Sequence, residues 1–272
     1  MTLVGHNVIN VMHPTGPLRL WDCNVTWADL EPVQGQFNWT KLDQLVDQAG
    51  NRSVMLVLGH PPLWAARDPD GGQAPWLPAG TNRPPKNYGL WENYVKAVAR
   101  RYKGRIDQYQ IWNEPADPKF YSGEYLVLAT MTQSARKIID RIDSRAMIVS
   151  APLQPRIPSG WPRKANAIMR AYHLIKYPFD IWAAHIYPVS NGITYWAHDA
   201  RVVYSETKRR ANKPLWITET NMNLLGKGNP WPIAKQTETI DKMLSQCYTI
   251  GIPRIYLYGY GHTQPELFAI GE

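Results

Sequence analysis

Residues 109–115 read Tyr-Gln-Ile-Trp-Asn-Glu-Pro, and the fold can be worked out from this short stretch. Its first four residues are mostly aromatic or β-branched, which is typical of the interior of a β-strand. Pro115 has no N–H to offer a neighbouring strand, so the strand is expected to end before it. Glu114 then lies at the C-terminal tip of a strand, where an isolated carboxylate is costly unless it has a function.

Short apolar runs alternate with longer helical patterns on both sides of this stretch. This alternation predicts repeated βα units around a parallel sheet. Residues 53–59 (SVMLVLG) are continuously apolar, as in a strand that is covered on both faces. The expected strands are 3–10, 18–23, 53–59, 107–114, 146–152, 179–188, 213–221 and 253–260. The expected helices are 40–50, 88–102, 123–142, 165–176, 198–211 and 233–249.

This element order and a length of 272 residues suit an α/β fold of the (β/α)8 TIM-barrel type. About eight residues join the first two expected strands, too few for a helical crossover, so the first helix is expected to be short or missing. The chain ends soon after 253–260, so an eighth helix is expected to be missing. We expect one domain over 1–272, a unit that could be excised from a larger protein. A flanking domain, an oligomer or the segment 264–272 could then cover the incomplete barrel exterior.

The composition is that of a folded domain. With 44% hydrophobic and 19% charged residues, the sequence does not resemble a disordered chain. No apolar run reaches the roughly 18 residues of a membrane span, and the first residues (MTLVGHNV) lack the pattern of a signal peptide. We therefore expect no membrane span and leave the compartment open. Cys23 and Cys247 are expected to be free, buried thiols.

The formal net charge of +8 suggests a nucleic acid or an acidic substrate at first sight. However, the basic clusters 100–105 (RRYKGR) and 208–213 (KRRANK) both precede expected strands. They should lie on αβ turns, at the end of the barrel away from the active-site face. We therefore expect a solvated basic underside and no nucleic-acid partner. Arg156, Arg163 and Lys164, after the fifth expected strand, are the exception and could contact acidic sugars.

Two motifs, IWNEP (111–115) and WITETN (216–221), resemble the two catalytic strands of the clan A glycoside hydrolases. Residues 19–43 are similar to the second-strand region of family 39 and its relatives. In that family an Asn-Glu pair supplies the general acid/base, and a Glu on strand seven is the nucleophile. The resemblance implies a retaining glycosidase with Glu114 as acid/base, Glu219 as nucleophile and Asn113 as a substrate contact. It also implies a carbohydrate substrate, with no cofactor and no metal.

The proposed chemistry makes its own demands on these two carboxyl groups. Retaining cleavage needs them about 5–5.5 Å apart, on opposite sides of the anomeric carbon. One must stay ionised to attack, and the other must start protonated, which a negative neighbour favours. Each residue also has a structural alternative. Glu114 could pair with a nearby Arg or Lys, and Glu219 could lie near the positive end of a helix dipole.

Further site candidates lie on other expected strands. His185 and Tyr187 are two residues apart and so share one side of a strand. The resemblance implies that both reach the site, with Tyr187 donating to Glu219; the alternative is a satisfied core pair. Arg19 would direct a fixed positive charge at the nucleophile, unless it forms a peripheral salt bridge. His60, at the end of a strand, is a candidate on the barrel rim.

Aromatic residues are numerous in the segments expected to be βα loops. Sugar rings present apolar C–H faces that stack on indole, so these residues favour a sugar-binding cleft, although each could instead anchor its loop. The tryptophans expected on such loops are Trp64, Trp76, Trp161, Trp196 and Trp231. The aromatic substrate contacts we predict are Trp64, Trp161, Trp231 and Tyr258.

Two other functions are compatible with the sequence. The first is a carbohydrate-binding barrel without catalysis, within a larger surface or phage assembly; a panel of aryl glycosides would separate it from an enzyme. The second is a metal-dependent hydrolase using His60, His185, His262 and Asp22. No His-x-His or His-Glu-x-x-His spacing supports it, and activity abolished by chelation would favour it. The sugar, its linkage and internal or terminal cleavage cannot be inferred from these residues.

Overall fold

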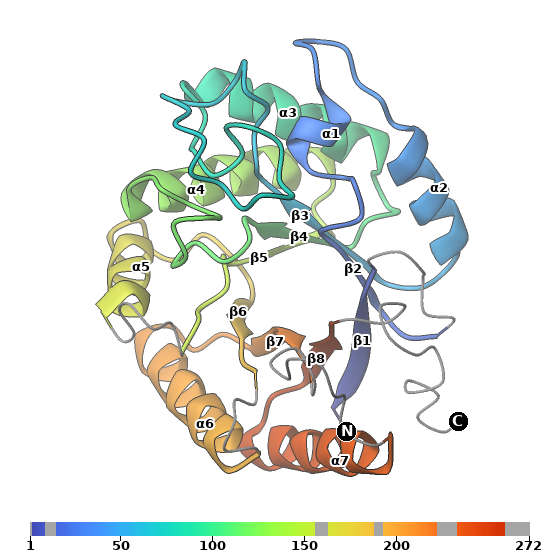
Figure 1. Cartoon of the computed structure of the whole chain (residues 1–272), viewed down its shortest axis with the longest axis vertical. Coiled ribbons are helices and arrows are strands. Elements are labelled where there is room, and N and C mark those ends of the chain that lie inside the picture. Colours follow the sequence, from blue (N-terminus) through green and yellow to red (C-terminus); the bar gives the residue numbers. More distant parts are fainter. Residues whose placement is uncertain (1, 9–14, 156–162, 188–192, 222–232, 259–272) are drawn as a thin grey trace.

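Parallel strands form the centre of the molecule and helices surround them (Figure 1). The computed structural model describes residues 2–8, 15–155, 163–187, 193–221 and 233–258. The strands of this part are β1 Leu3–Val8, β2 Leu18–Leu20, β3 Val54–Leu58, β4 Gln108–Ile111, β5 Met147–Val149, β6 Trp182–His185, β7 Leu215–Thr220 and β8 Arg254–Leu257. The helices are α1 Trp27–Leu30, α2 Thr40–Ala49, α3 Tyr88–Arg101, α4 Tyr125–Ile142, α5 Arg163–Leu174, α6 Ile193–Arg210 and α7 Ile233–Ile250.

The eight strands form one sheet in the order β5-β4-β3-β2-β1-β8-β7-β6. The two end strands meet through parallel bridges between Val149 and Ile181 and between Leu153 and Ala184. The sheet is thereby closed into a ring, and the prediction of a (β/α)8 barrel is confirmed. The segments 9–14 and 259–272 lie outside the described residues, so the short or missing first helix and the missing eighth helix stay predictions.

The strands are shorter than the sequence pattern predicts, and one helix was missed. Residues 21–23 were expected to belong to β2 but do not pair in the sheet. They lead into α1, which begins with a capping box: the Thr26 side chain accepts from the Asp29 N–H, and the Asp29 carboxylate accepts from the Thr26 N–H. This Thr-x-x-Asp spacing was the signal that could have predicted the helix.

Side chains that alternate along each strand divide most of the core into two parts, and a small third cluster includes Trp21. The larger part lies between strands and helices. The smaller part fills the barrel interior and consists of Met55, Val149, Ile181, Ala183, Trp216 and Tyr256. The Arg254 guanidinium lies 4.1 Å from the centre of the Trp216 ring in the same interior. A packed interior of this kind leaves the open end of the barrel, at the C-terminal ends of the strands, as the place for a site.

The remaining general expectations can be compared with the described residues. Cys23 and Cys247 are free and buried, as predicted. The basic clusters lie at the ends of α3 and α6, before β4 and β7, also as predicted. No helix in the described part of the chain is both long and apolar enough to cross a membrane.

Candidate active site

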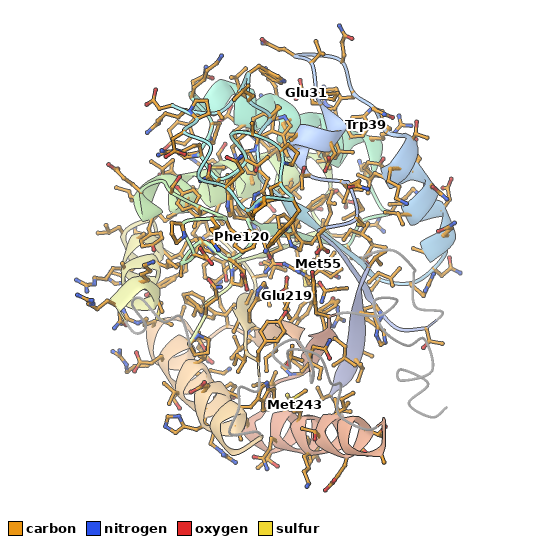
Figure 2. All side chains as sticks on the ribbon, viewed as in Figure 1. Glu31, Trp39, Met55, Phe120, Glu219 and Met243 are labelled. Carbon is orange, nitrogen blue, oxygen red and sulfur yellow. The ribbon has the colours of Figure 1, made fainter. Side chains whose placement is uncertain are left out.

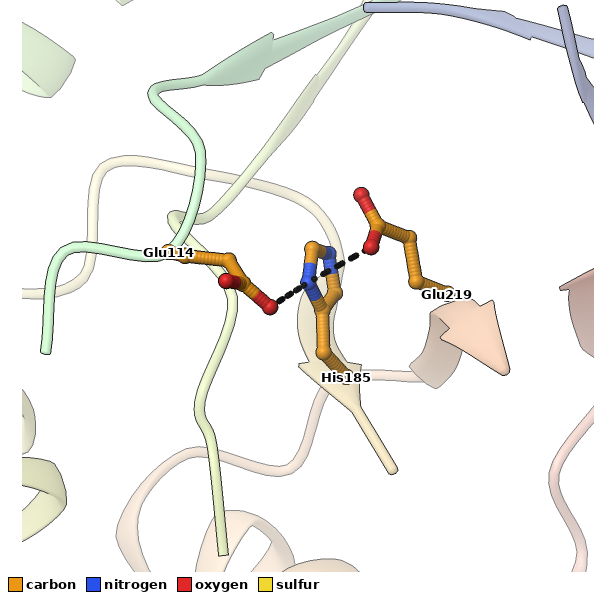
Figure 3. Close-up of side chains that lie close together, drawn as sticks. All are labelled: Glu114, His185 and Glu219. Atoms are coloured by element: carbon orange, nitrogen blue, oxygen red, sulfur yellow. Dashed lines mark hydrogen bonds and ion pairs between the residues drawn. The ribbon is translucent and has the colours of Figure 1, made fainter. Parts of the chain in front are cut away.

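Three side chains from three strands meet at the mouth of the barrel (Figure 3). Glu114 follows β4, His185 ends β6 and Glu219 lies in β7. The Nδ1 atom of His185 lies 2.9 Å from Glu114 Oε1 and 3.3 Å from Glu219 Oε2. One carboxylate oxygen of each glutamate and this nitrogen all lie within 4.8 Å of one another. The two carboxyl groups therefore face each other at a separation that suits retention and is too short for the roughly 6.5–9.5 Å of inverting enzymes.

The backbone after β4 is bent so that consecutive side chains reach the barrel mouth. Trp112 and Glu114 both have positive φ angles, of 67° and 41°, which is rare for residues with a side chain. The Trp112 N–H donates to the Leu58 carbonyl over 2.7 Å, and its indole donates to the Phe120 carbonyl. A Cβ atom on Gly59 would lie 2.6 Å from the Trp112 ring, so only glycine fits there. Close packing around Trp112 thus maintains a strained conformation at the site.

Glu219 reaches the site because β7 is irregular. Trp216 points into the barrel interior and Ile217 points out toward the helices. Regular alternation would turn Glu219 outward together with Ile217. The register of β7 shifts between Ile217 and Thr220, where it pairs with β8. This β-bulge turns Glu219 inward and Thr220 outward, where the Thr220 hydroxyl accepts from the Trp196 indole.

Arg19 from β2 connects the polar residues below the carboxylates. It is completely buried, and its Nη1 atom lies 2.6 Å from Glu219 Oε1. The same guanidinium donates to Asn113 Oδ1 over 2.8 Å. Its other acceptors are the side-chain oxygens of Asn7 and Gln110. The structure therefore brings Arg19 and Asn113 directly to the carboxylate pair, and Arg19 has no peripheral salt bridge.

The two carboxyl groups have different electrostatic surroundings. The pKa of Glu114 is raised to about 7, mainly by burial and also by the nearby Asp117, while Arg19 and a Gln154 hydrogen bond act in the opposite direction. Burial also raises the pKa of Glu219. However, Glu219 accepts directly from Arg19, and the Tyr187 hydroxyl donates to it over 2.8 Å. Of the two, Glu219 is therefore the group that is better suited to stay ionised.

His185 is a neutral hydrogen-bond donor between the two carboxyl groups. Burial lowers its pKa to about 3, although Glu219 favours the charged form. Its Nδ1 atom faces both carboxylates, whereas Nε2 is buried without a partner in the described part of the chain. An unpaired buried N–H costs more than an unpaired acceptor. We therefore place the proton on Nδ1, from which it is donated to Glu114.

Gln154 is a site residue that the sequence analysis missed. Its side chain is hydrogen-bonded to Glu114 and lowers the pKa of that carboxyl group. The preceding residue, Leu153, pairs with Ala184 of β6, which fixes this position beside His185. No motif surrounds Gln154, so only the closure of the barrel between β5 and β6 identifies it.

The structure also describes three further predicted site residues, His60, Trp64 and Tyr258. His60 is completely buried, with its ring centre 4.4 Å from that of Trp21 and 4.6 Å from that of Trp112, and its Nδ1 atom 3.1 Å from the Thr81 carbonyl oxygen. Trp64 is half-buried, and its indole donates to the Glu31 carbonyl. The Tyr258 hydroxyl donates to the Asp22 carboxylate. Their roles as substrate contacts stay predictions.

The remaining candidates lie elsewhere. Trp161, Trp231, Arg156 and His262 are outside the described residues. Trp196 was expected on a loop, but this was wrong: α6 begins at Ile193, and Trp196 is completely buried in it. Lys164, at the start of α5, donates to the Ala116 carbonyl over 2.7 Å.

The described residues that could hold a metal are Glu114, His185 and Glu219. They differ from the set expected for a metal-dependent hydrolase, since neither His60 nor Asp22 belongs to them. The Arg19 guanidinium already supplies a positive charge 2.6 Å from Glu219. A second cation bound at Glu219 would be repelled by it, so the donor set fits proton chemistry better than metal binding.

Comparisons with known proteins show similarity to glycoside hydrolases. The model of a family described as glycosyl hydrolase family 10 matches residues 22–134, less than half of the chain. An endo-1,4-beta-xylanase 4 from Arabidopsis thaliana is 22% identical over 247 residues, which cover 86% of this chain and 39% of the relative. The chain spans less than two fifths of the length of the curated relatives it matches.

Solved structures show the same barrel. A glucosidase from Croceicoccus marinus has a TM-score of 0.72 at 12% identity, over 94% of this chain and 59% of its own. Xylanase 10B from Thermotoga petrophila, solved with xylobiose, has a TM-score of 0.67 at 17% identity, over 95% of this chain and 82% of its own. The expected assignment to family 39 is not supported, since the matching family model is that of family 10. Together, the fold and these matches make the chain similar to the clan A glycoside hydrolases.

Proposed function

We propose that this chain is a retaining glycosidase related to family 10, with Glu114 as general acid/base and Glu219 as nucleophile. The observation that carries the proposal is the approach of the two carboxyl groups within 4.8 Å across His185, at the open end of the barrel. Their surroundings support the division of roles. Glu219 accepts from Arg19 and Tyr187, whereas the pKa of Glu114 is raised to about 7, so that it can hold a proton at neutral pH.

In the first step, the ionised Glu219 carboxylate attacks the anomeric carbon and forms a glycosyl ester. The bond from this carbon to the leaving oxygen breaks, and the proton of Glu114 moves to that oxygen. The Arg19 guanidinium holds Glu219 in place and also fixes Asn113, whose side-chain amide N–H₂ is then available to a sugar hydroxyl.

In the second step, Glu114 is ionised and accepts a proton from water, which attacks the same carbon. Glu219 leaves, and the sugar is released with its original anomeric configuration. Loss of the negative charge on Glu219 in the ester removes a repulsion on Glu114, so its pKa falls when it must act as a base. His185 donates to Glu114, which also favours the ionised form in this step.

We propose a β-1,4-linked xylan as the first substrate to test, because the curated relatives are endo-1,4-beta-xylanases. The similarity to a glucosidase structure makes β-glucosides the second choice. A binding barrel without catalysis would need neither a protonated Glu114 nor a buried cation beside Glu219, so the site favours an enzyme.

The test is hydrolysis of xylan, xylo-oligosaccharides and aryl β-glycosides, with the first-formed anomer followed by NMR. We expect hydrolysis with retention, and loss of activity in Glu219→Gln. A purified, folded chain that hydrolyses none of these substrates would contradict the proposal, and an inverted first product would contradict the double displacement.

A further inference from the structure

A pocket of about 670 Å³ lies where the segments that follow β2, β3 and β8 meet. This volume is in the range of small-molecule binding sites. The described residues that line it are Asp22, Asn24, Thr26, Asp29, Pro75, Trp76, Leu77, Pro78 and Tyr258. Tyr258 joins the pocket to the active site, because its N–H donates to the carbonyl of Thr220, the residue after Glu219, over 2.8 Å.

One wall of the pocket presents an exposed aromatic ring on a well-packed base. Trp76 is 68% exposed, which is unusual for so large an apolar side chain. The loop that carries it is held by a separate hydrophobic cluster of Trp21, Val57, Ala74 and Leu77. Phe120, which is labelled in Figure 2, packs against this cluster. The Ala74 N–H also donates to the Lys119 carbonyl over 3.1 Å. A fixed, open indole face of this kind is suited to stacking on the C–H face of a sugar.

The polar lining of the pocket is acidic, although the whole chain has a net charge of +8. Asp22 and Asp29 contribute two carboxyl groups, and no Lys or Arg is among the described lining residues. Both are fixed in position: Asp22 accepts from the Tyr258 hydroxyl, and Asp29 accepts from the Thr26 N–H over 2.9 Å. A ligand that carries a carboxylate would be repelled here, whereas hydroxyl and amino groups would find acceptors.

We infer that this pocket binds an uncharged or amino-bearing sugar unit next to the scissile one and rejects units that carry a carboxylate. The inference rests on the proposed function, since it names the substrates that the same site selects. It also limits the role expected for Arg163 and Lys164, because any acidic sugar would have to bind on their side, after β5.

Binding can test the inference without any turnover, in an inactive Glu219→Gln background. The two ligands are xylotetraose and xylotetraose that carries one glucuronic acid branch. We expect Trp76→Ala to weaken xylotetraose binding roughly three- to tenfold. We expect Asp22→Asn to raise the affinity for the acidic ligand relative to that for xylotetraose by roughly three- to tenfold, because the amide oxygen can still accept from Tyr258 but carries no negative charge. This improvement in affinity for the acidic ligand should be smaller at high salt, where charges are screened.

The control is Asp68→Asn, an exposed acid on the same loop that does not line the pocket. It should alter neither affinity. Equal affinity of the parent for both ligands, or no effect of Trp76→Ala, would overturn the inference. Hydrolysis of an aryl β-xyloside by the wild-type chain reports the proposed function separately, so a chain that binds as expected without hydrolysis contradicts only that function.

Discussion

Arg19 and Glu219 form an ion pair of 2.6 Å in which neither side chain has more than 6% exposure. One partner comes from β2 and the other from β7, so the pair spans the interior of the barrel. Burying two charges is costly, and their attraction offsets this cost only while both are present. The pair therefore matters to stability and to the charge state of the proposed nucleophile.

Replacement of Arg19 by Met should leave Glu219 as an uncompensated buried charge. We expect a loss of about 3–5 kcal/mol in the free energy of unfolding and a further rise of the Glu219 pKa. The acidic limb of the kcat/KM profile should then move to higher pH. Chemical denaturation and a pH series measure the two effects. The control is Arg101→Met, which breaks an exposed pair with Asp43 and should cost no more than about 1 kcal/mol. An equal loss of unfolding free energy in both variants would contradict the claim that the buried pair contributes more to stability than the exposed one.

Glu219→Gln should abolish turnover without affecting the fold. The amide has nearly the same shape but cannot attack the anomeric carbon, so kcat should fall by about 10³-fold or more. Circular dichroism and calorimetric titration with xylo-oligosaccharides should show an intact barrel that still binds sugar. Glu206→Gln, in the exposed part of α6, is the control and should retain full activity. Activity of the Glu219 variant near that of the wild type would exclude the proposed role.

Glu114→Ala should affect substrates according to their leaving groups. Aryl glycosides with good leaving groups need no proton on the leaving oxygen, so the rate of the first step should fall least for them. Azide should restore turnover by attacking the glycosyl ester in place of activated water, yielding a glycosyl azide. Steady-state kinetics across an aryl series, with and without azide, measures this. The assignment of Glu114 as acid/base fails if the variant loses the same activity on all substrates, whatever their leaving group, and if azide does not restore turnover.

The Glu114 pKa of about 7 sets the pH dependence of activity. The first step needs this group protonated, so kcat/KM should fall as pH rises through about 7. The acidic limb reports the ionisation of Glu219, and both limbs belong to the coupled pair. A kcat/KM profile between pH 4 and 9 tests this. Activity that stays level up to pH 9 would show that Glu114 is not the acid.

The same raised pKa predicts how stability depends on pH. Glu114 binds its proton more tightly in the folded chain than in the unfolded chain, where the ordinary value is 4.5. Its stabilising contribution is therefore present below pH 4.5 and is lost as pH rises toward about 7. Glu114→Gln removes this dependence. Between pH 4.5 and 8, the free energy of unfolding of the variant should therefore rise relative to that of the wild type by up to about 3 kcal/mol. Thermal unfolding of both proteins at pH 4.5 and pH 8 measures this change. A difference in stability between variant and wild type that is the same at both pH values would contradict the prediction.

Gly5 in β1 is required by the packing of the barrel interior. A Cβ atom there would lie 2.6 Å from Tyr256 Cε1 and 2.9 Å from the Pro17 carbonyl oxygen. Gly5→Ala should destabilise the chain by roughly 1–3 kcal/mol through overpacking. The control is Gly89→Ala in the first turn of α3, where a Cβ atom meets only Asn87 Oδ1 at 3.4 Å and helix propensity improves. Denaturant melts of both variants should separate them, and equal stability would be evidence against the packing argument.

The barrel could be predicted because each strand carries its own apolar run and each helix its own period. The ends of the elements could not, since β2 stops pairing at Leu20 although the strand was expected to continue to residue 23. For the same reason the start of α6 was placed too late, and Trp196 was assigned to a loop when it is buried in the helix. The ends of helices and strands depend on tertiary contacts, which the pattern of apolar and polar residues in the sequence does not show.

The site was predictable as a set of residues but not as a geometry. The motifs place Glu114 and Glu219 at strand tips, yet regular alternation would have turned Glu219 away from the barrel mouth. The β7 bulge that turns it inward has no signature in the sequence, and neither do the positive φ angles of Trp112 and Glu114. Gln154 was missed because its role comes only from the closure of β5 on β6.

The cluster of tilted rings around Trp112 also has a consequence for heat resistance. His60 lies between Trp21 and Trp112, and Trp112 in turn fills the space above Gly59. The left-handed backbone at Trp112 and Glu114 depends on the packing of these few rings, whereas the strands are held by the hydrogen bonds of the whole sheet. Warming should therefore inactivate the chain at a temperature below that at which the barrel melts, and cooling from that interval should restore activity in full.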